Sequence, residues 1–152
     1  MTNDPGIGNS MMNCILLLDD DQDDRDLFYE VVKMVNEDIK IFLLKDWEEL
    51  FEKSFLSEAK PDAIFLDLNM PRKNGNECLR SIKQDPQLRD IPVIIYSTTI
   101  NPNDLDVTFK EGAHFFLRKF NSYETMTLIM EKLIRNEIPM IKPVDKKQFV
   151  LK

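Results

Sequence analysis

The sequence predicts one α/β domain in which five parallel strands form an open, doubly wound sheet with helices on both faces. Three observations indicate this fold. Short apolar runs alternate with longer amphipathic segments along the chain. The apolar runs are continuous, as expected for strands that are buried on both faces. Four of the runs end at a polar residue, which places those residues at the sheet edge where such folds bind ligands.

The first half of the chain contains three apolar runs and two amphipathic segments. Strands are expected at 15–18, 39–44 and 63–66, because these runs are short and rich in Ile, Leu and Phe. Helices are expected at 23–35 and around 47–55, because their apolar residues recur every three or four positions.

The second half repeats the alternation. Helices are expected at 76–84, 103–110 and 123–136; Asp-Pro ends the first of these and a glycine ends the second. Strands are expected at 93–96, directly after a proline, and at 114–118. The resulting order is five strands, each followed by a helix.

The length of 152 residues fits one domain with its own core. We expect this domain to span 13–137, after a flexible leader at 1–12 that is rich in Asn, Asp, Gly and Pro. The remaining segment, 138–152, is too short to fold alone and is expected to be a disordered tail or an arm packed on a neighbouring surface.

The overall charge and the cysteines restrict the function. The net charge of −7 argues against a nucleic-acid surface, which needs clustered Lys and Arg. No apolar stretch is long enough to span a membrane. The two cysteines, Cys14 and Cys78, lack metal-ligand spacing, so both are expected to be reduced thiols in a cytoplasmic protein.

Carboxylates gather at the predicted ligand edge. Asp19 and Asp20 follow the first strand, and Asp67 follows the third. Carboxylates in one pocket repel each other, and Mg²⁺ relieves that repulsion with a preference for oxygen ligands. We expect Asp20 and Asp67 to bind Mg²⁺ directly, Asp19 to act mainly through water, and Asn69 to offer its backbone carbonyl.

The other polar residues at this edge suit phosphoryl transfer. Asp67 would be the nucleophile, forming an acyl phosphate. The Lys119 ammonium would neutralise charge on the phosphoryl oxygens, and the Ser97 hydroxyl would bond the same group once it is in place. Movement of Ser97 would then report phosphorylation to the rest of the domain.

The aspartate-rich run at 19–26 has two plainer interpretations. Asp23, Asp24 and Asp26 are expected to form only a solvated helix start, where acidic residues are favourable. The run also imitates a calcium-binding EF-hand loop. However, Asp24 occupies the position where that loop needs glycine, and the preceding segment is a strand pattern, so this interpretation is rejected.

Four blocks of the sequence, in the right order, resemble the receiver domains of two-component response regulators. The most specific block is Ile-Phe-Leu-Asp-Leu-Asn-Met-Pro at 64–71, with Gly75 after it. The other three lie at 16–21, 92–98 and 112–119. The resemblance covers most of the chain and is similar to single-domain, chemotaxis-type receivers, especially the branch that includes phytochrome partners.

The resemblance implies a flavodoxin-like sheet of order 2-1-3-4-5 and a stand-alone switch, not an enzyme in the usual sense. A sensor histidine kinase would phosphorylate Asp67 in a reaction that needs Mg²⁺. Phe116 takes the place of the family's switch aromatic and would swing inward as Ser97 moves. The output would be altered binding of a histidine phosphotransfer protein or another effector protein, without nucleic acid or membrane.

The sequence departs from the family at three positions. Phe120 stands where the family usually has a proline after the lysine, joined by a cis bond, so a trans bond with a shifted loop, or local strain, is expected. Ser97 replaces the commoner Thr. Phe116 lacks the hydroxyl of the commoner Tyr.

Three other functions remain open. The chain could be a phosphate shuttle to a histidine phosphotransfer protein, or a receiver that works without phosphate. A metal-dependent aspartyl-phosphate hydrolase is disfavoured, because such enzymes often use a second Asp two residues after the nucleophile and Asn69 lies there. The chain is expected to be a monomer, or a homodimer formed through the last helix or the C-terminal arm.

Overall fold

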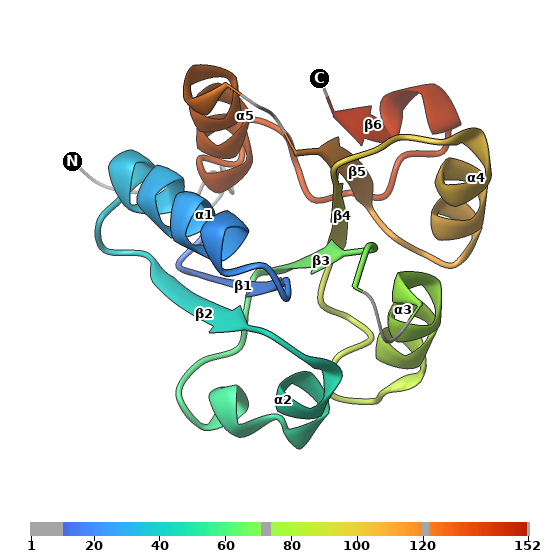
Figure 1. Cartoon of the computed structure of the whole chain (residues 1–152), viewed down its shortest axis with the longest axis horizontal. Coiled ribbons are helices and arrows are strands. Elements are labelled where there is room, and N and C mark those ends of the chain that lie inside the picture. Colours follow the sequence, from blue (N-terminus) through green and yellow to red (C-terminus); the bar gives the residue numbers. More distant parts are fainter. Residues whose placement is uncertain (1–10, 71–73, 120–121, 152) are drawn as a thin grey trace, which may run out of the picture.

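The computed structural model describes residues 11–70, 74–119 and 122–151. They form a parallel sheet in the order β2-β1-β3-β4-β5-β6 (Figure 1). The five predicted strands and their order are confirmed, but the expected total of five was wrong, because a sixth strand extends the sheet beside β5. The strands are β1 Cys14–Leu18, β2 Lys40–Leu44, β3 Ala63–Asp67, β4 Val93–Ser97, β5 Phe115–Arg118 and β6 Val150–Leu151.

The five predicted helices are also present. They are α1 Gln22–Val35, α2 Trp47–Glu52, α3 Gly75–Gln84, α4 Pro102–Lys110 and α5 Tyr123–Ile134. Each begins after a capping Asp, Asn or Ser whose side chain accepts a hydrogen bond from a backbone N–H in the first turn. The second helix is shorter than expected, because Lys53 adopts a left-handed conformation and a 3₁₀ turn, Ser54–Ser57, follows.

The sheet has a separate apolar core on each face. Side chains alternate across a strand, so Ile15 and Leu17 of β1 pack on the side of α1 and α5, while Leu16 and Leu18 pack on the side of α2, α3 and α4. Figure 1 shows this two-sided cover. Within the described segments, no helix is long and apolar enough to cross a membrane.

Both described ends of the chain pack on the domain itself. The backbone N–H of Met12, in the segment expected to be a leader, donates to the Ile134 carbonyl oxygen at 2.8 Å, and the Met12 side chain is buried. The arm after α5 crosses to α4 and ends in β6, where Val150 pairs with Phe116 of β5. Its Phe149 ring is fully buried.

Candidate functional site

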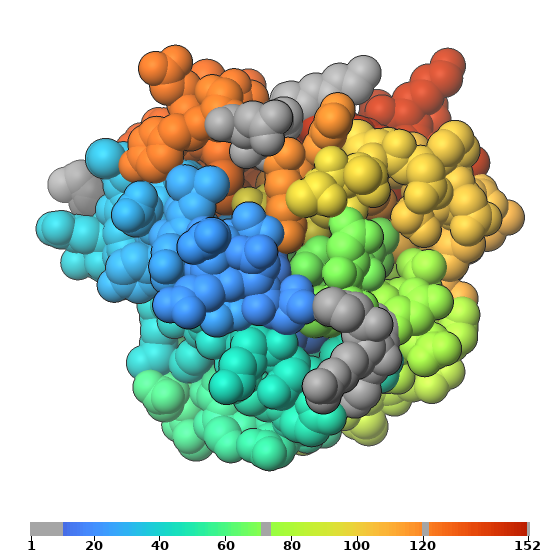
Figure 2. Space-filling model, in the orientation of Figure 1, coloured from blue at the N-terminus to red at the C-terminus, as the bar shows by residue number. Residues whose placement is uncertain are grey.

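The carboxyl edge of the sheet brings the predicted site residues together. Asp19 follows β1, Asp67 ends β3, Ser97 ends β4 and Lys119 follows β5. Because these four strands are parallel neighbours, their carboxyl ends lie at the same edge. Figure 2 shows this side of the molecule, where the start of α1 (blue) lies near the segments that follow β3 (green), β4 (yellow) and β5 (orange).

Three carboxylates form a compact cluster at this edge. One oxygen each of Asp19, Asp20 and Asp67 lies within 4.8 Å of the others. Asp19 is fully buried, Asp67 is 3% exposed, and Asp20 is exposed. Burial raises the pKa of Asp67 to about 6 and outweighs the hydrogen bond from the Asn69 N–H, which lowers the pKa; the nearby charge of Asp19 is a smaller cause that also raises it. This donor set suits a hard divalent cation such as Mg²⁺.

Lys119 lies at the centre of the acidic cluster. Its Nζ atom is 2.7 Å from Asp19 Oδ2, 2.8 Å from Asp24 Oδ2 and 3.7 Å from Asp67 Oδ1. The Tyr96 ring lies below, with its centroid 5.1 Å from Nζ. Burial alone would lower the pKa of the Lys119 ammonium, but the hydrogen bonds to Asp19 and Asp24 outweigh it, so the pKa is raised. The lysine is therefore charged and fixed.

The contact with Asp24 was missed by the sequence analysis, which assigned this residue to a solvated helix start. Asp24 lies in the first turn of α1, whose cap, Asp21, accepts a hydrogen bond from the Asp24 N–H. That turn follows directly on the Asp19 strand end and so faces the same edge. The sequence does indicate that the helix begins only a few residues after the strand that ends before Asp19. This short spacing does not single out Asp24, because Asp23 lies equally near the strand end and yet is exposed.

Ser97 is held by a network that includes Asn69. Ser97 is fully buried, and its Oγ accepts from Asn69 Nδ2 at 3.1 Å and from the Thr99 N–H at 3.3 Å. Asn69 Nδ2 also donates to Thr98 Oγ1 at 3.2 Å, while the Asn69 backbone N–H donates to Asp67 Oδ1 at 3.0 Å. Asn69 thus links the Asp67 carboxylate to the Ser97 hydroxyl at the end of β4.

Gly75 fixes the loop that follows Asp67. A Cβ atom at this position would lie 2.6 Å from the Leu68 Cα and 3.1 Å from the Leu68 carbonyl oxygen. Only a glycine permits α3 to begin this close to the loop backbone. The residues between, 71–73, lie outside the described part of the chain.

The predicted switch aromatic, Phe116, is fully buried in β5. Its ring centroid lies 6.2 Å from that of Phe149, and Phe149 in turn stacks edge-on against Phe109 of α4 at 5.3 Å. The Phe116 N–H also donates to the Phe149 carbonyl oxygen at 2.9 Å. The C-terminal arm therefore contacts the aromatic that the resemblance names as the switch. Phe120, whose peptide bond was in question, lies outside the described residues.

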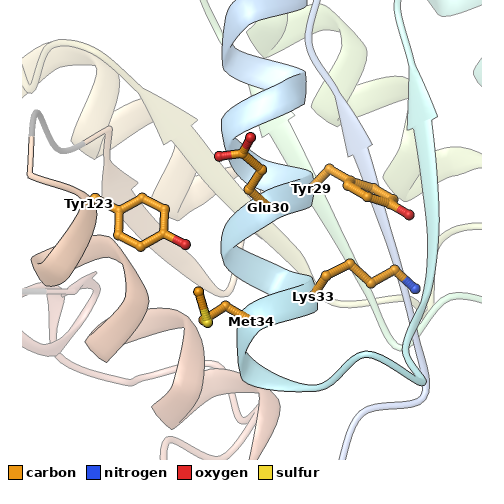
Figure 3. A pocket seen from close by; sticks show the side chains of 5 residues that line it. All are labelled: Tyr29, Glu30, Lys33, Met34 and Tyr123. Carbon is orange, nitrogen blue, oxygen red and sulfur yellow. The ribbon is translucent and has the colours of Figure 1, made fainter.

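A shallow groove of about 500 Å³ lies between α1 and α5 (Figure 3). Five side chains line it: Tyr29, Glu30, Lys33, Met34 and Tyr123. None of the predicted site residues is among them. The groove is therefore a feature of the α1–α5 surface and not part of the carboxylate site.

Comparisons with known proteins agree with this geometry. Residues 15–131 match the family profile described as the response regulator receiver domain. Response regulator Rcp1 of the cyanobacterium Synechocystis is 35% identical over 112 residues, which are 69% of this chain and 75% of Rcp1. RcaC of Microchaete diplosiphon is 31% identical over 87% of the chain, which spans only 19% of that longer protein.

Solved structures show the same likeness. The crystal structure of the phosphorylated cyanobacterial phytochrome response regulator RcpA matches with a TM-score of 0.73 and 25% identity, covering 88% of this chain and 99% of RcpA. The Mn²⁺-bound form of Rcp1 matches with a TM-score of 0.67 and 28% identity, covering 87% of this chain and 99% of the Rcp1 chain. The chain belongs to the response regulator receiver domain family of two-component systems.

Proposed function

We propose that this chain is a phosphorylation-controlled switch of the cytoplasm, which accepts a phosphoryl group on Asp67 from a sensor histidine kinase. The observation that carries the proposal is the juxtaposition around one buried carboxylate: an ammonium 3.7 Å away, a cluster of two further carboxylates, and a hydroxyl held through Asn69. The structures of phosphorylated RcpA and of Mn²⁺-bound Rcp1 support the same chemistry in these relatives.

The residues divide the phosphoryl transfer among them. An Asp67 carboxylate oxygen attacks phosphorus, the bond between phosphorus and the donor's histidine nitrogen breaks, and an acyl phosphate forms. Lys119 Nζ lies 3.7 Å from Asp67 Oδ1 and would hydrogen-bond a phosphoryl oxygen there. Ser97 retains a hydroxyl proton that it can donate to another phosphoryl oxygen, which would pull the end of β4 toward the group.

The carboxylate cluster fits Mg²⁺. Asp19, Asp20 and Asp67 would hold the ion, and the Asn69 backbone carbonyl would add a further oxygen ligand. When bound, the ion neutralises charge on the phosphoryl oxygens. The raised pKa of Asp67 shows that its negative charge is poorly compensated in this structure, so the site would gain from a cation.

The proposed output is altered binding of an effector protein at the surface of α4, β5 and α5. The arm already covers part of this surface: Lys142 Nζ donates to the Phe109 carbonyl oxygen at 2.5 Å, and Lys146 pairs with Asp106 at 3.0 Å. A partner at α4 would therefore contact the arm as well. A phosphate shuttle to a histidine phosphotransfer protein is the second candidate, and a short lifetime of the acyl phosphate would distinguish it.

The test is the intact mass of the protein after incubation with acetyl phosphate and Mg²⁺. The wild type and the exposed control Asp23→Asn should gain one phosphoryl group, whereas Asp67→Asn and a sample with EDTA should gain none. Equal labelling of Asp67→Asn would place the acceptor elsewhere. A folded wild type that stays unlabelled both by acetyl phosphate and by a panel of histidine kinases would contradict the proposal.

A further inference from the structure

Two of the carboxylates that bind Lys119 do not receive the phosphoryl group. An ammonium has three N–H donors. Asp19 and Asp24 accept hydrogen bonds from Nζ at 2.7 and 2.8 Å, while Asp67 lies at 3.7 Å, beyond hydrogen-bonding distance. The lysine side chain is only 9% exposed and lies against the Tyr96 ring, so it has little freedom to turn. Its charge is thus shared with two acids before any phosphoryl group arrives.

The two partners differ in how easily they can release the lysine. The Asp19 side chain is fully buried, and Arg25 Nη1 donates to the Asp19 carbonyl oxygen at 2.8 Å, which fixes its backbone. Release of Asp19 would leave a buried charge unpaired, which is strongly unfavourable. The Asp24 side chain is 33% exposed, so water can solvate its carboxylate after release. Asp24 is therefore the partner that can exchange.

The position of Asp24 allows this exchange without movement of the main chain. Its backbone N–H is held by the Asp21 side chain at 3.0 Å, in the first turn of α1. The positive end of the helix dipole stabilises the Asp24 carboxylate whether or not it contacts the lysine. A rotation of the side chain toward solvent is enough to free one N–H of Lys119.

We propose that Asp24 is a positioning residue that holds Lys119 in the resting state and competes with the phosphoryl group for it. The inference rests on the proposed function, because it assigns Asp24 a role at the same site. A phosphoryl oxygen on Asp67 must draw Lys119 Nζ closer than its present 3.7 Å from Asp67 Oδ1, whereas the hydrogen bond to Asp24 at 2.8 Å holds the ammonium back and shares its charge. Removal of the Asp24 carboxylate should make Lys119 more available to the phosphoryl group. It should also remove one negative charge that lies beside the approach of that group to Asp67.

The test measures binding of beryllofluoride, a mimic of an aspartyl phosphate, by titration calorimetry at saturating Mg²⁺. Asp24→Asn should bind the mimic about two- to five-fold more tightly than the wild type, the range expected for loss of one partly exposed ion pair. Asp24→Glu, which keeps the charge, should return toward the wild-type affinity. Asp23→Asn makes the same change of charge at an exposed neighbour and should stay at the wild-type value at 0.15 M salt.

The outcomes separate this inference from the proposed function. If the wild type fails to bind beryllofluoride with Mg²⁺ and is not phosphorylated, the proposed function falls and the inference with it. If the wild type binds but Asp24→Asn matches Asp23→Asn, or binds more weakly than the wild type, the role of Asp24 alone is overturned. Asp24→Ser, which also removes the charge, repeats the test with a second side chain if Asp24→Asn folds poorly.

Discussion

Replacement of the Asp67 carboxylate, the proposed phosphoryl acceptor, should make the metal-free protein more stable. Burial raises the pKa of Asp67 from 3.8 to about 6, with a further contribution from the charge of Asp19. At about 1.36 kcal/mol per pKa unit, this ionised carboxylate lowers the free energy of unfolding by about 3 kcal/mol at neutral pH. Asp67→Asn keeps the size of the side chain and an oxygen that can accept from the Asn69 N–H, but it carries no charge. Lys119 retains its hydrogen bonds to Asp19 and Asp24 in this variant.

The direction of the pKa change fixes how the gain depends on pH. The folded protein holds the Asp67 proton more tightly than the unfolded chain does, so it binds more protons between pH 3.8 and about 6. The contribution of this carboxyl to stability is therefore fully present below pH 3.8 and is lost as the pH rises through about 6. The gain of Asp67→Asn over the wild type should be about half its full size near pH 5 and complete above about pH 7.

Urea unfolding at pH 5 and pH 7.5 in EDTA measures this gain, with circular dichroism as the probe. The exposed Asp23→Asn serves as the matched control and should change the free energy of unfolding by less than about 0.5 kcal/mol at either pH. The reasoning is refuted if Asp67→Asn is no more stable than the wild type at pH 7.5, or if its gain is as large at pH 5. Addition of Mg²⁺ should narrow or reverse the difference in free energy of unfolding between Asp67→Asn and the wild type. The wild type keeps the Asp67 carboxylate and should bind the ion better, and a ligand stabilises the protein that binds it better.

Three further substitutions test the packing and the charges around the site. Lys119→Met should lower the free energy of unfolding in EDTA by about 3 kcal/mol, because it leaves buried carboxylates unpaired. It should also abolish labelling of the protein by acetyl phosphate. An unchanged free energy of unfolding would contradict the argument from burial. Phe149→Ala removes a fully buried ring from between α4 and β5. It should lower the free energy of unfolding by about 3–5 kcal/mol in the same urea assay. A loss below about 1 kcal/mol would show that the C-terminal arm packs loosely. Gly75→Ala introduces a Cβ 2.6 Å from the Leu68 Cα. It should therefore lower the free energy of unfolding by about 1–3 kcal/mol and slow the labelling of Asp67. Labelling at the wild-type rate would show that the loop shifts without any effect on Asp67.

Most of the fold follows from local patterns, and the part that does not depends on tertiary contact. Each predicted strand contains a run of at least three apolar residues within a four- to six-residue segment, long enough to identify as a buried strand. The sixth strand has two residues, Val150–Leu151, preceded by Phe149 and, before it, by polar Lys and Gln. Nothing in so short a segment predicts pairing. It becomes a strand because Phe149 fits into the core between α4 and β5, which brings the following residues to the exposed edge of β5.

The site shows the same division. Asp19, Asp67, Ser97 and Lys119 were predictable as neighbours, because each lies at a strand end and parallel strands share one edge. Asp24 was not predictable, because its importance depends on a contact with Lys119, which is 95 residues away in the sequence. Six of the eight residues at 19–26 are aspartates. The sequence therefore predicts a negatively charged segment, but it does not predict which of these side chains faces inward.

The electrostatics of the resting site connect its stability to its proposed function. Three acids surround one ammonium, and the raised pKa of Asp67 shows that the lysine does not compensate them fully. The uncompensated charge destabilises the metal-free fold, yet the same charge attracts a divalent cation. Asp67→Asn and Asp24→Asn remove charges from one cluster: the first should raise the free energy of unfolding and abolish labelling, and the second should raise the affinity for a phosphoryl group on Asp67. If both variants changed only stability, the cluster would be a structural ion network, and a signalling role for Lys119 would lose its support.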